Sequence, residues 1–442
     1  MTNRITKMDD FLIEYERVLE RALSYGARNV PLTGFPDGEI DWKIAKRFIS
    51  ACHRGWERAQ DRVVDLVQQL SCEQNLDEKE RLYRQLLLRK IIDTIACTML
   101  EGKIYAMRRL AFHGRVPPVD LRVIKETQQT ANRNNHESRL TFSVIADLTT
   151  FVHICDLLKV DFRQGHRRLS LIELKDGKVN EILLTQLERY ELKDESLNKI
   201  RDDDEIKTNY KKQATRIFRQ KIRLDQVVTM LRDDKGIDPE TKKPIFLVGD
   251  VKGNSVEEEH YGQFLAKLIE SSEKNQHGVS SGTVNRCLHL GVGYSSNKNT
   301  ARTSAIYAAT YSMKKQLKDS SIELAQIKNQ LLTLIPEKDL TIMGDLFKAN
   351  LYSLPVIPFL LWPISKQNKF DLMKRNLVIV FIFDLPGFFL LGKRIGVDLQ
   401  LSTRKEADSI KKEVGVKNVT TFGNRMVKCI VGGQSIVLLA LI

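Results

Sequence analysis

The chain has 442 residues and carries a formal charge of +14, with a pI near 9.3. Its composition, with 42% hydrophobic and 29% charged residues, excludes an intrinsically disordered chain, and its length predicts two or three folded domains. The excess of positive charge favours a polyanionic partner, such as nucleic acid or a phosphate-rich surface, over an acidic protein substrate.

The cysteines and histidines argue against a zinc-bound or disulfide-linked scaffold. The six cysteines form no CxxC pair, and the eight histidines form no HExxH motif and no zinc-ligand spacing with them. The N-terminus is amphipathic and acidic where a signal peptide would be apolar. We therefore expect a reduced, cytoplasmic protein.

The first 112 residues have the apolar spacing of long helices. Hydrophobic residues recur with helical period over 11–23, 44–70 and 77–111. Three antiparallel helices of this kind would bury their apolar stripes against one another. We expect residues 1–115 to form a helical bundle domain, through which the chain could form a homo-oligomer.

After Pro117-Pro118 the pattern changes to mixed helices and strands. In chain order we expect helices at 121–132 and 136–148 and strands at 152–162 and 168–175. The turn-forming residues 163–166 lie between the two strands, which predicts a β-hairpin.

The remainder continues this alternation. We expect a charged insertion at 187–206, a basic helix at 207–231, a strand at 245–248, a helix at 255–270, a loop at 275–283, a strand at 287–294, helices over 300–335, and strands at 377–383, 396–402 and 427–431. The predicted class is α/β (α+β), with a central domain at 116–300 and a C-terminal helical and strand-containing region at 301–442. The apolar stretches 351–364 and 377–391 are short and interrupted, so we expect buried strands and turns there in preference to membrane insertion, and a membrane-proximal effector that uses 351–391 stays an alternative.

Three side chains on the predicted hairpin could carry chemistry. Asp156 opens the first strand run, and Glu173 and Lys175 end the second. Residues two apart on a strand point to the same face, so Glu173 and Lys175 would project together. Two carboxylates from neighbouring strands suit a hard divalent cation that keeps several waters.

This combination of an Asp, a hairpin and the triplet Glu173-Leu174-Lys175 resembles the core of the PD-(D/E)XK nuclease superfamily, which includes many restriction enzymes. The resemblance implies a restriction-endonuclease-like mixed sheet flanked by helices, and metal-dependent hydrolysis of phosphodiester bonds. It implies that Asp156 and Glu173 bind Mg²⁺ or Mn²⁺ and that Lys175 orients the attacking water. The family often adds an acid from the preceding helix, for which Glu137 is the candidate.

The resemblance also implies a nucleic-acid contact on the helix after the second hairpin strand. In the basic segment 207–223 the candidates lie along one polar edge: Lys212, Gln213, Arg216, Arg219 and Gln220. DNA is the favoured substrate, and RNA stays open. By analogy, a nuclease without a GxxxxGK[ST] motif would be the effector of a bacterial anti-phage or restriction system, with regulation supplied by a separate protein.

Several alternatives stay open. Asp161 competes with Asp156 for the metal, and Asp250-Val251-Lys252 is a second acid-x-Lys triplet. Glu173 and Lys175 could instead form a solvated ion pair on a sheet edge. In that case the chain would be a non-catalytic nucleic-acid-binding or scaffolding protein.

Overall fold

The structure is a computed structural model. It describes residues 7–23, 41–102, 107, 110, 119–174, 228–229, 235–237, 244–246, 262–318, 322–348, 357–394, 396–408, 427–431 and 434–437. The expected mixture of helices and sheets is confirmed. Within the described residues every strand pair is antiparallel, so the parallel pairing of a restriction-endonuclease-like mixed sheet is not among them.

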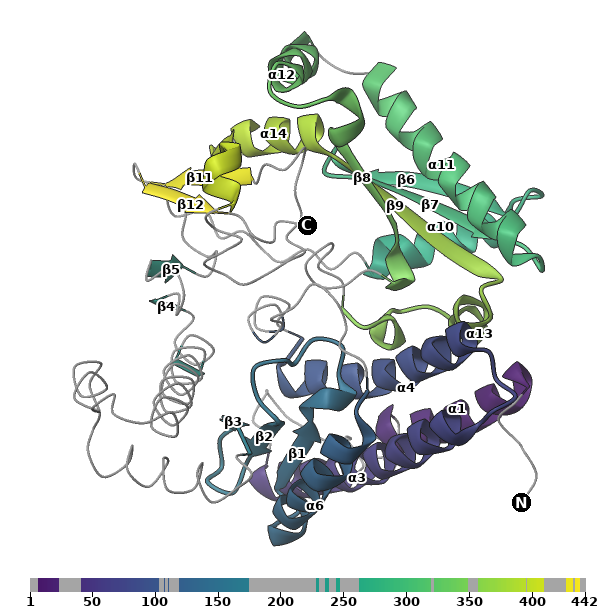
Figure 1. Cartoon of the computed structure of the whole chain (residues 1–442), viewed down its shortest axis with the longest axis vertical. Coiled ribbons are helices and arrows are strands. Elements are labelled where there is room, and N and C mark those ends of the chain that lie inside the picture. Colours follow the sequence, from purple (N-terminus) through teal and green to yellow (C-terminus); the bar gives the residue numbers. More distant parts are fainter. Residues whose placement is uncertain are drawn as a thin grey trace, which may run out of the picture.

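The three expected N-terminal helices are present as α1 (Met8–Leu23), α3 (Trp42–Cys72) and α4 (Glu78–Met99), which lie alongside one another (Figure 1). Aspartates cap the starts of α3 and α4 because their carboxylates accept hydrogen bonds from backbone amides of the first turn. The third helix is shorter than predicted. It ends at Met99, since Glu101 and Gly102 both adopt positive φ, which a right-handed helix cannot continue.

A helix and a three-stranded antiparallel sheet follow. They are α6 (Leu121–Glu137), β1 (Thr141–Ile145), β2 (Leu157–Asp161) and β3 (Arg168–Ile172), in the order β1-β2-β3. The predicted hairpin of β2 and β3 is confirmed, and Gly165 at its turn has a φ of +83°.

The expected helix at 136–148 was wrong. Residues 136 and 137 end α6, and the residues from 141 onward form β1 and one turn of 3-10 helix, η1 (Ala146–Leu148). All five residues of β1 are buried, and the periodicity of a short, fully buried strand does not distinguish it from a helix.

A second, four-stranded sheet follows α10 (Gly262–Lys274). It contains β6 (Val279–Val284), β7 (Leu288–Tyr294), β8 (Thr341–Asp345) and β9 (Leu377–Asp384), in the order β6-β7-β9-β8. The loop expected at 275–283 was wrong for its second half, which forms β6. The predicted domain boundary at 300 falls between β7 and β9, which are neighbours in this sheet.

Helix α11 (Lys298–Lys318) covers one face of the second sheet (Figure 1). Gly291 and Gly293 allow this packing, since a Cβ on either would lie 2.0–2.1 Å from a backbone oxygen of α11. The two glycines therefore serve close helix packing. Between α11 and β8 lie α12 (Ile322–Leu332) and η2 (Glu337–Asp339), and η3 (Leu346–Lys348), η4 (Phe359–Leu361) and α13 (Lys366–Lys374) precede β9.

One hydrophobic core joins the helices to both sheets. It contains buried side chains from α1, α3, α4 and α6, from β1 and β2, and from the opposite face of the second sheet, including Leu290, Val292 and Phe381. The Tyr83 hydroxyl of α4 also donates a hydrogen bond to the carbonyl of Met373, 2.8 Å away. The predicted boundary at 115 therefore separates segments that share one core.

The remaining elements are β4 (Lys235–Ile237), β5 (Pro244–Phe246), α14 (Leu385–Arg394), β10 (Asp398–Leu401), β11 (Val427–Val431) and β12 (Gln434–Val437). The strands expected in the tail are confirmed as β9, β10 and β11. The apolar stretch 377–391 is strand β9 followed by α14. Among the described residues, no helix combines the length and the apolar character needed to cross a membrane.

Candidate functional site

The structure brings Asp156 and Glu173 to the same end of the β2–β3 hairpin. The register pairs Leu157 with Ile172, so Asp156 precedes and Glu173 follows a directly opposed pair. The Asp156 amide donates to the Ile172 carbonyl at 2.9 Å, and the Asp156 carbonyl accepts from Ala146 at 2.9 Å. Asp156 thus joins the ends of all three strands.

The side chain of Asp156 is held by the segment that carries Glu173. One carboxylate oxygen of Asp156 accepts a hydrogen bond from the backbone amide of Leu174. Both Asp156 and Glu173 are half-buried. The Asp156 carboxylate is therefore oriented, and both acids are partly exposed at the end of the hairpin opposite its turn.

Helix α4 anchors the loop that leads from β1 to Asp156. The buried Arg89 donates from Nε to the carbonyl of Thr149 at 3.1 Å. Asp93 accepts from the amide and the hydroxyl of Thr150, each at 2.6 Å. Hydrogen bonds to charged groups are stronger than neutral ones, so this buried pair on a rigid helix positions the loop.

Two further carboxylates, those of Asp147 and Asp120, lie near one another, and Asp147 also lies near Glu173. Burial raises the pKa of Asp147 in η1; the Arg89 guanidinium opposes that shift, and Asp120 and Glu173 add to it. Asp120 caps the start of α6 by accepting from the Arg122 amide at 2.9 Å. The pKa of the buried Cys155 thiol is raised by burial and by Asp156, Glu173 and Asp147. Several carboxylates of the described residues therefore lie at this end of the sheet, beside the guanidinium of Arg89.

The donor set at this end consists of hard oxygen ligands. Among the described residues, no group of three or more His, Cys, Asp or Glu side chains is arranged to hold a metal ion. A Mg²⁺ site needs fewer, since this ion is usually bound by one or two carboxylates, with waters and substrate phosphate completing the shell. Asp156 and Glu173 fit that requirement.

The other predicted ligands lie elsewhere. Asp161 and Glu137 are at the turn end of the hairpin, where Arg163 contacts Asp161 at 2.6 Å and Glu137 at 3.8 Å. The hydrogen bond from Arg163 lowers the pKa of Asp161. Because β2 separates that end from Asp156, the structure does not bring Glu137 to the site. Asp120, at the opposite end of α6, is the helix acid that lies near Asp147.

Several predicted residues lie outside the described part of the chain. These are Lys175, Lys212, Gln213, Arg216, Arg219, Gln220 and Asp250.

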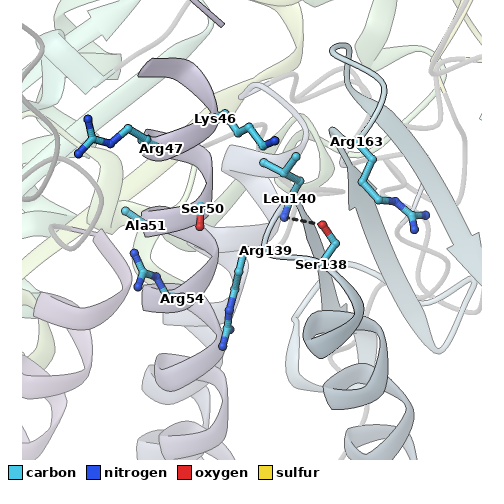
Figure 2. A pocket seen from close by; sticks show the side chains of 9 residues that line it. All are labelled: Lys46, Arg47, Ser50, Ala51, Arg54, Ser138, Arg139, Leu140 and Arg163. Carbon is cyan, nitrogen blue, oxygen red and sulfur yellow. Dashed lines mark hydrogen bonds between the residues drawn. The ribbon is translucent and has the colours of Figure 1, made fainter. Parts of the chain in front are cut away.

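A basic groove that the sequence reasoning missed lies at the turn end of the sheet. Its volume is about 660 Å³. Five cations line it: Lys46, Arg47 and Arg54 from α3, Arg139 from the turn before β1, and Arg163 from the hairpin turn (Figure 2). Neither Asp nor Glu is among its lining residues, which include Ser50 and Ser138.

The groove had a local signal in the sequence. Lys46, Ser50 and Arg54 recur every fourth residue, which places them on one face of a helix. The segment 43–56 contains no acidic residue. The apolar stripe of the same helix predicted its core face, and the polar face was left without an assignment. Arg139 and Arg163 join this face only through the tertiary fold.

Comparison of the chain with protein-family models, with curated proteins and with solved structures finds no match.

Proposed function

We propose that this protein is a metal-dependent nuclease of the PD-(D/E)XK kind, which hydrolyses phosphodiester bonds of DNA. The observation that carries the proposal is the meeting of Asp156 and Glu173 at the open end of the β2–β3 hairpin. The order α6, β1, β2, β3 and the position of the acids relative to the strands agree with the resemblance seen in the sequence. The family's mixed sheet also contains a parallel strand pair. The proposal includes such a pair, which is not among the strand pairs of the described residues.

In this function Asp156 and Glu173 would hold Mg²⁺ or Mn²⁺. When bound, such an ion polarises the scissile phosphate and lowers the pKa of a bound water. The concentration of carboxylates supports the proposal, because a cation would neutralise the repulsion that helps to raise the pKa of Asp147.

The protein's own contribution is to fix the acids before substrate binds. The Leu174 amide orients the Asp156 carboxylate, and Arg89 and Asp93 hold the preceding loop. Preorganised charges of this kind need no rearrangement during the reaction. Lys175, two residues after Glu173 in the sequence, would orient the attacking water.

The test is a cleavage assay with the full chain. Supercoiled plasmid and linear duplex are incubated with Mg²⁺, Mn²⁺ or EDTA. We expect metal-dependent cleavage that falls by at least about 100-fold in Asp156→Asn, Glu173→Gln and Lys175→Ala, since each removes a group at the reacting phosphate. Glu137→Gln is the matched control, because this acid lies at the other end of the sheet, and it should cleave as the wild type does.

Cleavage that persists in EDTA, or that survives in both Asp156→Asn and Glu173→Gln, would contradict the proposal. The second candidate is a non-catalytic nucleic-acid-binding or scaffolding protein. It is favoured by the basic groove, which is lined by five cations and by neither Asp nor Glu. It predicts binding without cleavage under every metal condition.

The biological role follows by analogy. A nuclease without its own motor motif suits the effector of a bacterial anti-phage or restriction system in the cytoplasm, licensed by a separate regulatory protein. Self-association through the N-terminal helices would allow two strands to be cut together.

A further inference from the structure

We propose that the basic groove on α3 binds the sugar-phosphate backbone of a nucleic acid and anchors it away from the cleavage site. The binding itself does not depend on catalysis. Only the statement that the anchored strand is the one cleaved rests on the proposed function.

The charges of the groove are available to a ligand. Lys46, Arg47 and Arg54 are exposed, and within the described residues none of them forms an ion pair. In Figure 2, Lys46 points across the groove towards the hairpin, while Arg47 and Arg54 extend outward from α3. Unneutralised cations that line an open groove attract anions.

The two other arginines of the groove, Arg139 and Arg163, form ion pairs with carboxylates that hold them in place. Arg139 contacts Glu57 at 2.6 Å, and Arg163 contacts Asp161 at 2.6 Å. A guanidinium has five N–H donors, so Arg139 keeps donors for a phosphate after pairing with Glu57. Arg163 also keeps donors, although it pairs with Asp161 and lies 3.8 Å from Glu137. Ser138 accepts from the Leu140 amide at 3.2 Å, which leaves its hydroxyl hydrogen for an anion.

The dimensions favour a row of phosphates over a single one. Lys46 and Arg54 are eight residues apart on α3, which corresponds to about 12 Å at 1.5 Å per residue. Successive nucleotides of one strand rise by about 3.4 Å, so this face spans about three to four nucleotides.

The shape disfavours a membrane surface. Lipid-binding basic faces combine cations with protruding apolar side chains. The apolar residues that line this groove, Ala51 and Leu140, are buried. A nucleic acid, which needs cations and donors but no apolar insertion, fits the lining better.

The groove and the acids Asp156 and Glu173 lie at opposite ends of β2. Asp156 precedes β2 and Phe162 follows it. The six residue steps from Asp156 to Phe162, at about 3.3 Å each, separate these two residues by about 20 Å. That length equals about six nucleotides of one strand. A backbone held at the groove could therefore extend along the sheet to Asp156 and Glu173.

The test measures binding without cleavage, using a fluorescent duplex and single strand in EDTA at several salt concentrations. The groove variant is Lys46→Gln/Arg47→Gln/Arg54→Gln. The matched control is Arg122→Gln/Lys125→Gln/Arg133→Gln, which removes the same charge from the exposed face of α6. We expect the groove variant to bind at least about tenfold more weakly and to lose up to about three units of the salt slope, because fewer counterions are released. The control should change little.

Equal losses in the two variants would overturn the proposal, since they would show only an effect of net charge. So would groove-dependent binding to anionic phosphatidylserine vesicles without binding to nucleic acid. Thermal unfolding of both variants excludes a folding defect. A further comparison uses single substitutions: Arg54→Lys keeps the charge and should therefore retain most of the affinity that Arg54→Gln loses. If the wild type binds nucleic acid through the groove and never cleaves it, the proposed function fails and this inference stands. If the wild type cleaves and the groove variant has an unchanged KM, this inference alone fails.

Discussion

His53 shows how a single residue links the core to the basic groove. It is 3% exposed, and its Nδ1 lies 2.9 Å from the carbonyl of Arg139, which lines the groove. Its ring packs against Trp56 and Phe142, with centroids 5.4 and 5.8 Å away. Burial among aromatic rings disfavours the charged imidazole, so the pKa of His53 falls to about 4.

This burial predicts a loss of stability in mild acid. The pKa of His289 in β7 is also lowered by burial to about 4. Between pH 6.5 and 4 the unfolded chain binds protons that the folded chain does not, so stability falls as the pH drops through this window. At pH 5 the loss is on the order of 2 kcal/mol for each histidine. Urea unfolding at pH 7.5, 6 and 5 measures it.

His289→Gln provides the comparison for this effect. Because the variant has no group that titrates at this position, its stability should depend less on pH than that of the wild type. A pH dependence identical in the two proteins would show that the buried imidazole of His289 does not cause the loss.

At the scale of elements, the outer edge of β1 is closed by side chains. Gln60 of α3 donates to the Ser143 carbonyl at 3.2 Å and accepts from the Ile145 amide at 3.0 Å. Asn135 of α6 accepts from the Ser143 amide at 2.7 Å. The side-chain amides of Gln60 and Asn135 take the hydrogen-bonding positions that a neighbouring strand would take, so β1 does not offer an open edge to another chain.

Removal of the hydrogen bonds that Gln60 makes to the edge of β1 should lower the stability of the protein. Gln60→Leu leaves a buried carbonyl and a buried amide without their partner, which should destabilise the protein by about 1–3 kcal/mol. Gln129→Leu, on the exposed face of α6, should change stability by less than about 0.5 kcal/mol. Urea denaturation compares the two. A loss for Gln60→Leu no larger than for Gln129→Leu would mean that the edge hydrogen bonds contribute little.

The hairpin and its acids could be predicted because their signals are local. Strand-forming residues flank a glycine turn, and Asp156 and Glu173 stand at matching ends of the two runs. The third acid could not be placed in this way. Since α6 turns tightly into β1, the start of the helix lies near the end of the strand, and only the fold shows that Asp120 lies near Asp147 while Glu137 lies at the turn end of the hairpin.

At the scale of the whole molecule, the β1-β2-β3 sheet has the candidate metal site at one end and the basic groove at the other. Carboxylates gather at the end that contains Asp156, and cations gather about 20 Å away at the hairpin turn. The net charge of +14 indicated a polyanionic partner without showing where it binds. The groove combines residues from three separate segments, so no local pattern could reveal it.

The most direct test of the account is the binding of Mn²⁺ by the full chain, because it does not depend on the choice of substrate. Electron paramagnetic resonance measures free Mn²⁺ during titration, with and without duplex DNA. We predict a Mn²⁺ site in the wild type and in Glu137→Gln that is lost in Asp156→Asn and in Glu173→Gln. Equal binding by all four proteins, or no binding by any of them, would contradict a metal centre at this end of the sheet.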